Sequence, residues 1–357
     1  MSVFNNVHLH GHEAVVYGFD PDAGLRAIIA LHNTSCGPAL GGCRMWAYEN
    51  EEQALADVLR LSRSMTYKSA LAGLRFGGGK AVVIGDPRRD KTEALLRAMG
   101  RFIDSLGGRY ITAEDAGTSV EDLKIMAKET DHVAGIADRR DIDGNWRSGD
   151  PSPATAYGVL MGIQASVQER LDRSDLEDIR VALQGLGHVG WCLAQYLLRA
   201  GARLWVTDIR PEVRERAAAE LDVTVVEPNA IYAQPVDVFA PCALGAVLND
   251  QSIPQLQARV VAGSANNQLA EERHGEMLRR RGILYAPDYV INAGGVIDVA
   301  HGFDGYDPRQ ARLHIERIAE TLAEIYCRAR RSASPTSREA DRIAEERFQL
   351  RRTVAAA

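Results

Sequence analysis

The chain has 357 residues, of which 46% are hydrophobic and 25% charged, and this length and composition favour two globular domains over one. A net charge of −6 and a pI near 5.9 provide no overall attraction for nucleic acid or an anionic membrane. We therefore expect a small-molecule substrate.

The N-terminus has neither a basic region nor an apolar run, and no segment approaches the roughly 20 apolar residues that span a bilayer, which predicts a cytoplasmic protein. The cysteines are odd in number and scattered, without a CxxC pair, as is typical of reduced thiols. They are Cys36, Cys43, Cys192, Cys242 and Cys327.

Two β-type runs at residues 13–17 and 25–32 flank a strong turn sequence, which predicts an opening hairpin. His8, His10 and His12 alternate just before the first run and would share one face of a strand. Because no separate fourth ligand is evident, a polar edge is a better interpretation of the three histidines than a metal site.

An amphipathic helix is predicted from Asn50, a suitable N-cap, to about Tyr67, and it places Lys68 at its far end. Three consecutive glycines then precede Lys80, which suggests a turn with positive φ that leaves room for a ligand. A phosphate-binding P-loop fits poorly, since Gly73 lies one place too early and Ala81 has no hydroxyl for magnesium.

A short buried strand at residues 81–84 and a helix at 93–106 follow, and then a strand-like run at 109–113. Glu114 and Asp115 come directly after this run. A carboxylate at a strand end can carry protons, but it can also cap the next helix. The two interpretations are balanced for Asp115, and the structural one is favoured for Glu114.

Residues 134–150 contain glycine and clustered charge without an apolar period, which predicts the connection between the domains. The expected division is a substrate-binding and oligomerisation domain at 1–148 and a nucleotide domain at 149–330. A helical tail at 331–357 would pack on the first domain or on a neighbouring subunit.

The second half begins with a helix from about Pro153 and then carries the clearest motif. A β run from Arg180 leads into Gly185-x-Gly187-x-x-Gly190, a helix and a second strand that ends at Asp208. This context predicts a doubly wound Rossmann domain. Asp208 would accept the ribose hydroxyls and so favours NAD over NADP, although Arg210 weakens that preference.

Further strands are predicted at 223–226, 236–239, 260–263 and 283–285, alternating with helices. The amides of Asn266 and Asn292 lie at strand ends, where they could bond a nicotinamide or a ribose. Cys242 reads as a small buried residue and not as a nucleophile. Helices at 311–330 and 338–350 would form the C-terminal region.

Several motifs together resemble the Glu/Leu/Phe/Val family of amino-acid dehydrogenases, and its leucine-specific members most. They cover nearly the whole chain. They are GPALGGCRMW from Gly37, MTYK ending at Lys68, GGGK ending at Lys80, ITAEDAGT around Asp115, PSPATAYGV from Pro151, FAPCALGAV from Phe239, AGSANNQL from Ala262 and GILYAPDYVINAGGV from Gly282.

The resemblance implies reversible, NAD-dependent oxidative deamination of an L-amino acid to a 2-oxo acid and ammonia by a homo-oligomer. Lys68 would bind the substrate carboxylate, Lys80 would activate water, and Asp115 would shuttle protons. The resemblance also implies further substrate contacts at Leu40, Gly41, Gly42, Met65, Ala113, Val290 and Val296. The expected cofactor contacts are Thr155, Gly185, Gly187, His188, Val189, Gly190, Asp208, Arg210, Cys242, Ala243, Asn266 and Asn292.

Nothing cationic stands at Leu40 to pair with a second carboxylate, so glutamate is a poor substrate and leucine, valine or isoleucine is expected. An aromatic amino-acid dehydrogenase and a non-catalytic NAD-binding regulator are the alternatives. The chain departs from the family pattern at His188, Arg75 and Phe76, and the last two bear on substrate range.

Overall fold

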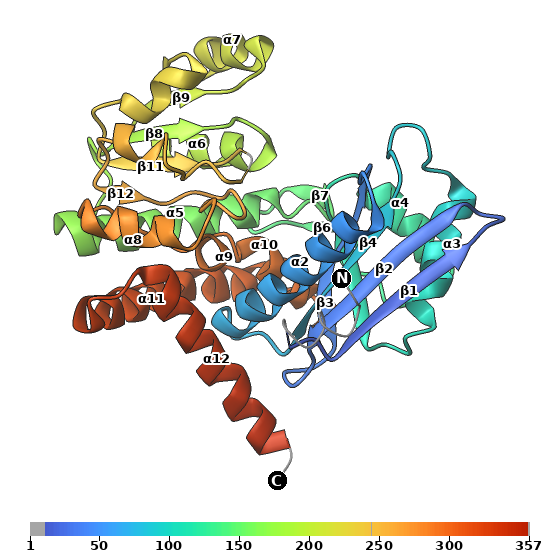
Figure 1. Ribbon diagram of the computed structural model, residues 1–357. Helices are drawn as coiled ribbons and strands as arrows, with labels where there is room; N and C mark the ends of the chain where they lie inside the picture. The colour runs from blue at the N-terminus through green and yellow to red at the C-terminus, as the bar shows by residue number, and fades with distance from the viewer. Residues whose placement is uncertain (1–10, 244, 356–357) are drawn as a thin grey trace.

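Two separate β-sheets organise the chain in a computed structural model that describes residues 11–243 and 245–355 (Figure 1). The first sheet is mixed, and the second is entirely parallel. The predicted two-domain α/β fold with a Rossmann-type second domain is confirmed. His8 and His10 lie outside the described residues.

The first sheet has five strands in the order β1-β2-β4-β3-β5. The predicted opening hairpin is confirmed as β1 paired with β2, and β4, β3 and β5 run parallel to one another. Strand β3 was not predicted, because its two glycines obscure the alternation of apolar residues. The strands are β1 (Ala14–Asp20), β2 (Leu25–Asn33), β3 (Ala39–Trp46), β4 (Gly77–Ile84) and β5 (Tyr110–Glu114).

Helices cover both faces of this sheet. Ile28 and Ala30 of β2 pack under α2 (Glu51–Leu71), whereas Ala27 and Ile29 face α3 (Glu93–Asp104) and α4 (Val120–Met126), as the period of two requires. The Asn50 side chain caps α2 by accepting the N–H of Gln53. The helix continues one turn beyond its predicted end, so Lys68 belongs to its last turn.

The three glycines before Lys80 form extended strand, and the predicted turn with positive φ is wrong. Their absent side chains permit close approach instead. A Cβ on Gly78 would lie 2.0 Å from the backbone nitrogen of Thr66 on α2, and one on Gly77 would lie 2.0 Å from the carbonyl oxygen of Asn33. Strand β4 therefore sits against both α2 and β2 at distances that only glycine allows.

The segment between the sheets contains a small hairpin of β6 (Asp138–Arg140) and β7 (Trp146–Ser148), although the sequence suggests a loop. Gly135 and Gly149 lie against each other at its base, both with positive φ. We call the part of the chain built on the mixed sheet the first lobe and the part built on the parallel sheet the second lobe. Arg139 pairs with the buried Asp298 of α10 (Gly294–His301) over 2.5 Å, so the hairpin is fixed to the second lobe.

The second sheet has the order β10-β9-β8-β11-β12-β13, which is 3-2-1-4-5-6 counted from β8 and is the Rossmann order. Strands β10, β12 and β13 are shorter than predicted, and β11 begins and ends two residues later than predicted. They are β8 (Arg180–Gln184), β9 (Arg203–Thr207), β10 (Thr224–Val225), β11 (Val238–Pro241), β12 (Val260–Val261) and β13 (Leu284–Tyr285). The helices are α5 (Ser152–Leu171), α6 (His188–Arg199), α7 (Pro211–Glu220), α8 (Arg273–Arg280), η1 (Pro228–Ala233) and η2 (Ile253–Gln255).

The C-terminal helices connect the lobes. They are α9 (Asp288–Ile291), α10, η3 (Gly302–Asp304), α11 (Pro308–Ser332) and α12 (Thr336–Ala355). Helix α12 runs from the end of α11 past α2 (Figure 1). Tyr67 of α2 donates a hydrogen bond to Glu345 of α12 over 2.7 Å, and Tyr289 of α9 donates to Asp341 over 2.6 Å. One helix thus contacts both lobes.

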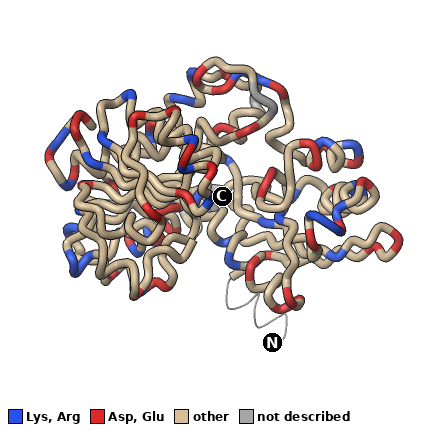
Figure 2. The backbone as a smooth tube through the Cα atoms, turned by 90° about the horizontal axis from the view of Figure 1, so that it is seen from above, with Lys and Arg blue, Asp and Glu red and all other residues tan. Residues whose placement is uncertain are grey.

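Acidic and basic residues are interspersed over both lobes in the view of Figure 2. Among the described helices, none combines the length and the apolar character that a membrane crossing requires.

Candidate active site

A cleft of about 320 Å³ lies between the lobes. The first lobe contributes residues of β3, α2, β4 and the end of β5, and the second contributes α5, α6 and the segments that follow β12 and β13. Of the predicted residues, the cleft brings together Leu40, Gly41, Gly42, Met65, Lys68, Lys80, Ala113, Asp115, Thr155, Val189, Asn266, Asn292 and Val296.

Lys80 and Asp115 form the charged centre of the cleft. Lys80 Nζ lies 3.2 Å from Asp115 Oδ2, and the lysine side chain is only 6% exposed. Gly42 of β3 makes room for them, because a Cβ there would lie 2.7 Å from the Cβ of Asp115 and 3.0 Å from Lys80 Nζ. The lysine and the acid are close enough to exchange a proton directly.

Asp115 is held as a carboxylate. Burial raises the pKa of its carboxyl group, but the positive charges of Lys80 and Arg44 outweigh burial and leave the pKa below its usual value. Arg44 Nε donates a hydrogen bond to Asp115 Oδ2 over 2.8 Å. The side chain that caps α4 belongs to Ser119, so Asp115 is not a helix cap.

Lys68 lines the same cleft from the last turn of α2. Burial and the neighbouring charge of Lys80 lower the pKa of Lys68 to about 8, while Asp288 opposes the shift. Lys68 can therefore be either a cation or a neutral amine at pH values close to 8.

An apolar pocket adjoins the charged centre. It is lined by Leu40, Ala113, Val296 and Val299, and Ile111, Ala134 and Phe76 belong to the same hydrophobic cluster without lining the cleft. Val290 is not part of it, contrary to the sequence-based expectation. Val290 is buried in the core of the second lobe and lines a separate small cavity beside Leu71 and Ile318. Val299 takes the expected place, one helical turn after Val296 on α10.

The glycine loop between β8 and α6 has the form that a dinucleotide requires. Gly185 has φ of +98°, and a Cβ on Gly190 would lie 2.0 Å from the carbonyl oxygen of Gly185. A Cβ on Gly187 would meet nothing within 4 Å, so the N-terminus of α6 is open toward a ligand. A pyrophosphate fits this position. Gly187, His188 and Arg210 line the hollow of about 610 Å³ beside it.

Asp208 lies at the end of β9, as predicted. Burial acts against its ionisation, but hydrogen bonds from Arg210 and from the backbone N–H of Leu186 keep the pKa of its carboxyl group below its usual value. Arg210 Nε donates to Asp208 Oδ1 over 3.1 Å. The acid next to the glycine loop is thus ionised and already paired with a cation.

Amide side chains gather where the strands of the second sheet end. Asn292 donates to Asn266 Oδ1 over 2.7 Å and to the carbonyl oxygen of Ser264 over 3.0 Å. The buried Oδ1 of Asn292 has no hydrogen-bond donor among the described residues. Asn292 lines the cleft, and a carboxamide bound there could supply the missing donor.

Two predicted cofactor residues, Cys242 and Ala243, lie behind the glycine loop. The Ala243 Cβ would be 2.8 Å from a Cβ placed on Gly185, and the Cys242 N–H donates to the carbonyl oxygen of Gln184 over 2.7 Å. Burial raises the pKa of the Cys242 thiol, as expected of an unreactive cysteine.

Two charged residues of the cleft, Arg44 and Asp288, were not among the predicted site residues. Leu40, Gly42 and Arg44 alternate along β3, so recognising this strand would have placed Arg44 beside the other two. Glu114, for which a structural role was favoured, faces the cleft and is not a helix cap. Burial and the negative charge of Asp150 raise the pKa of Glu114.

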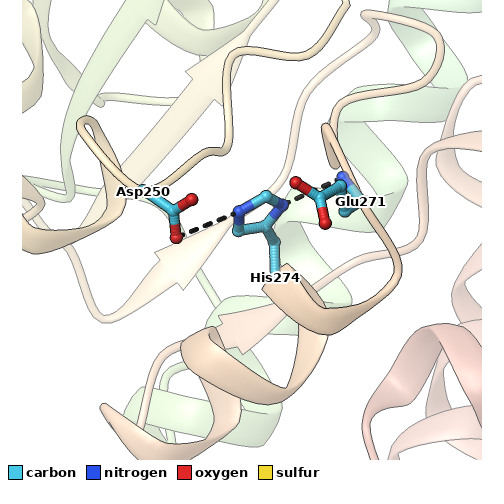
Figure 3. Close-up of side chains that lie close together, drawn as sticks. All are labelled: Asp250, Glu271 and His274. Carbon is cyan, nitrogen blue, oxygen red and sulfur yellow. Dashed lines mark hydrogen bonds and ion pairs between the residues drawn. The ribbon is translucent and has the colours of Figure 1, made fainter.

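A separate group, Asp250, Glu271 and His274, has the composition of a metal site (Figure 3). His274 Nδ1 accepts the backbone N–H of Glu271 over 2.9 Å, so a neutral ring carries its proton on Nε2, which faces Asp250. Arg273 pairs with both carboxylates. A proton and a guanidinium therefore already occupy the positions that a cation would need.

His12, the one described member of the N-terminal histidines, is buried, and its Nε2 lies 2.7 Å from Ser62 Oγ of α2. The predicted polar edge is wrong for this residue. His12 instead packs edge-on against His32.

Comparisons with known proteins agree with this geometry. Residues 12–132 match the Glu/Leu/Phe/Val dehydrogenase dimerisation domain, and residues 206–304 match the Glutamate/Leucine/Phenylalanine/Valine dehydrogenase domain. Leucine dehydrogenase of Geobacillus stearothermophilus is 52% identical, over 99% of this chain and 95% of its own. Phenylalanine dehydrogenase of Bacillus thermotolerans is 48% identical, over 95% of this chain and 89% of its own. The crystal structure of L-tryptophan dehydrogenase from Nostoc punctiforme superimposes with a TM-score of 0.85 at 44% identity, over 98% and 99%.

Proposed function

Since the chain belongs to the Glu/Leu/Phe/Val dehydrogenase family and is an NAD(P)-dependent amino-acid dehydrogenase of the leucine dehydrogenase type, we propose that its substrates are branched-chain L-amino acids. Leucine, valine or isoleucine would be deaminated reversibly to the 2-oxo acid and ammonia. The observation that carries this proposal is one cleft in which Lys68, Lys80 and Asp115 adjoin an apolar pocket.

The two lysines have separate roles in this proposal. Lys68, in its cationic form, binds the substrate carboxylate. Lys80 acts as the base that activates water against the imino carbon of the oxidised substrate, and Asp115 receives and returns the protons. The 3.2 Å separation of Lys80 Nζ and Asp115 Oδ2 supports direct proton exchange between them.

The pocket lining supports the choice of a branched aliphatic side chain. Leu40, Val296 and Val299 are uncharged, so a second substrate carboxylate would be buried there without a partner. Phe76 packs against this lining and against Phe303, with ring centroids 5.3 Å apart.

NAD is the proposed cofactor, and it supplies the hydride acceptor for the substrate Cα–H when bound. The open N-terminus of α6 at Gly187 would receive the pyrophosphate, and Asp208 the adenosine ribose. The unsatisfied Asn292 Oδ1 would accept from the nicotinamide carboxamide. The ionised Asp208 would repel a 2′-phosphate, which supports NAD over NADP.

We also propose that residues 1–148 bind substrate and form subunit contacts, that 149–330 bind NAD, and that the tail at 331–357 packs on the first domain or on a neighbouring subunit. The match of residues 12–132 to a dimerisation domain supports a homo-oligomer.

The test is NADH formation with a panel of L-amino acids. We expect the highest kcat/KM with leucine, valine or isoleucine and low values with phenylalanine, tryptophan and glutamate. Aliphatic substrates that differ by one methylene should differ by only about 10–200-fold, because such discrimination is limited to about 1–3 kcal/mol. A preference for an aromatic substrate would contradict the proposed specificity, and no turnover with any amino acid would contradict the reaction.

A further inference from the structure

Arg44 connects two carboxylates that come from different elements. Its Nε donates to Asp115 Oδ2 over 2.8 Å, and its Nη1 donates to Asp57 Oδ2 over 2.9 Å. The Arg44 side chain is largely buried. Asp57 belongs to α2, the helix that carries Lys68. The guanidinium therefore links the acid of the charged centre to the helix of the substrate-binding lysine.

Asp57 is itself held in place. Tyr48 donates to its Oδ2 over 2.7 Å, and Arg60 donates to its Oδ1 over 2.8 Å. Since both oxygens of Asp57 have donors, its carboxylate cannot rotate without losing a hydrogen bond. The fixed Asp57 carboxylate orients the planar guanidinium of Arg44, and the guanidinium in turn orients Asp115.

We propose that Arg44 is a positioning residue of the deamination reaction, which holds Asp115 in one orientation through its anchor at Asp57. This inference rests on the proposed function of the cleft. Arg44 and Lys80 both approach Oδ2 of Asp115, whereas no hydrogen bond from a described residue reaches Oδ1. Oδ1 is thus the oxygen that takes up a proton from the substrate or from water, which leaves a neutral carboxylic acid that later returns the same proton.

The charges around Asp115 make the proposal measurable. Lys80 from β4, Arg44 from β3 and Lys68 from α2 bring positive charge to it, and Glu114 from β5 brings negative charge. The titratable groups of Cys43, Tyr48 and Tyr110 also interact with it, and Asp57 lies on the other side of Arg44. Removal of the Arg44 charge should raise the pKa of Asp115. The acidic limb of the pH profile of kcat should therefore move to higher pH.

The competing interpretation is that Arg44, which lines the cleft, binds the substrate carboxylate itself. Loss of a group that binds the ground state and the transition state equally raises KM and leaves kcat unchanged. Loss of a positioning group lowers kcat instead. The division of the effect between kcat and KM therefore separates the two roles.

The experiment compares Arg44→Gln and Arg44→Lys in the full-length enzyme. In Arg44→Gln we expect kcat to fall by about 100-fold, as for a misplaced catalytic group, with little change in KM and with the acidic limb shifted upward. Arg44→Lys retains the charge but cannot bridge both carboxylates, so the limb should return toward that of the wild type while kcat stays low.

Arg26→Gln is the matched control, because Arg26 pairs with Glu51 and so also links this sheet to α2, but at the surface and away from the cleft. It should behave as wild type. NADH binding and cooperative unfolding show whether Arg44→Gln is folded. If it is not, Asp57→Asn is the second variant, and it should also lower kcat.

Wild-type kcat with an unshifted limb in Arg44→Gln would overturn the positioning role, and so would a rise in KM at constant kcat. Failure of the proposed function would look different, because the wild-type enzyme itself would then show no turnover.

Discussion

Asp208 Oδ2 accepts a hydrogen bond from the backbone N–H of Leu186 over 2.9 Å, and the acid at the end of β9 is thereby tied to the glycine loop. Arg210 binds the same carboxylate, with Nε 3.1 Å from Oδ1. The position of the acid and the shape of the loop are therefore interdependent.

Replacement of Asp208 by Ser should weaken NAD binding and reduce the discrimination against NADP. The ribose loses its acceptor, and Arg210 is released to meet a 2′-phosphate. The ratio of kcat/KM for NAD to that for NADP should fall about tenfold or more, which corresponds to one charged hydrogen bond. An unchanged ratio would show that Asp208 does not bind the ribose.

Lys80→Ala should remove most of the turnover without affecting the nucleotide. A general base contributes about 10²–10⁴-fold to a rate, so kcat should fall within that range. NADH binding, followed by fluorescence, should be retained. Lys128→Ala is the control, because Lys128 is half exposed and pairs with Glu93 away from the cleft. Near-normal turnover in Lys80→Ala would mean that the base is another group.

Lys68→Met should stabilise the protein at neutral pH while weakening substrate binding. The folded-state pKa of Lys68, about 8, lies below its ordinary value of 10.5, so folding is penalised wherever the lysine is charged in both states, which is below pH 8. Between pH 8 and 10.5 only the unfolded chain binds this proton, and the free energy of unfolding rises with pH.

The penalty amounts to about 3 kcal/mol, at 1.36 kcal/mol per pKa unit. Denaturant unfolding of Lys68→Met and wild type at pH 7 and at pH 10 measures it. The stability difference should shrink at the higher pH. A stability difference that is constant with pH would show that burial does not lower the pKa of Lys68.

The same lysine predicts the pH dependence of 2-oxo acid binding. Above pH 8 the charged fraction of Lys68 falls about tenfold per pH unit, and the affinity for a carboxylate should fall with it. The affinity is measured as binding of the 2-oxo acid to the enzyme–NADH complex. Ammonia is left out because its own titration would change the signal with pH. An affinity that stays constant from pH 7 to 9.5 would assign the carboxylate to another cation.

Val296→Ala should widen the apolar pocket and shift the preference from leucine toward phenylalanine. The removed methyl groups are worth about 1–3 kcal/mol of discrimination, and the ratio of kcat/KM values reports the change. Val290→Ala is the matched control in the same region, since Val290 is buried outside the cleft. It should lower stability by about 2 kcal/mol, for two buried methyl groups and the cavity they leave, with the ratio unchanged. An altered ratio in the control would place Val290 in the pocket.

Local rules account for the parts of the fold that the sequence predicts. The strand, glycine loop and helix around Gly185 are adjacent in the chain, and Asp208 lies at the end of the next strand, so spacing alone locates them. Helix α2 follows in the same way from its cap at Asn50 and its apolar period.

Features that depend on distant residues did not follow from the sequence. The glycines before Lys80 suggested a turn, because their actual requirement comes from Thr66 and Asn33 on other elements. The pairing of Arg44 with Asp57 and Asp115 likewise needs β3 to be recognised as a strand. Val290 and Val299 lie on two different short helices, α9 and α10, and which of them faces the cleft depends on how these helices pack.

Helix α12 has a consequence for how the molecule unfolds. Tyr67 of the first lobe and Tyr289 of the second both donate to carboxylates of this one helix, Glu345 and Asp341. Melting of either lobe removes a partner of α12 and so lowers the stability of the other. Tyr67 also belongs to the hydrophobic core of the second lobe, so the two lobes would behave in a calorimeter as one cooperative unit.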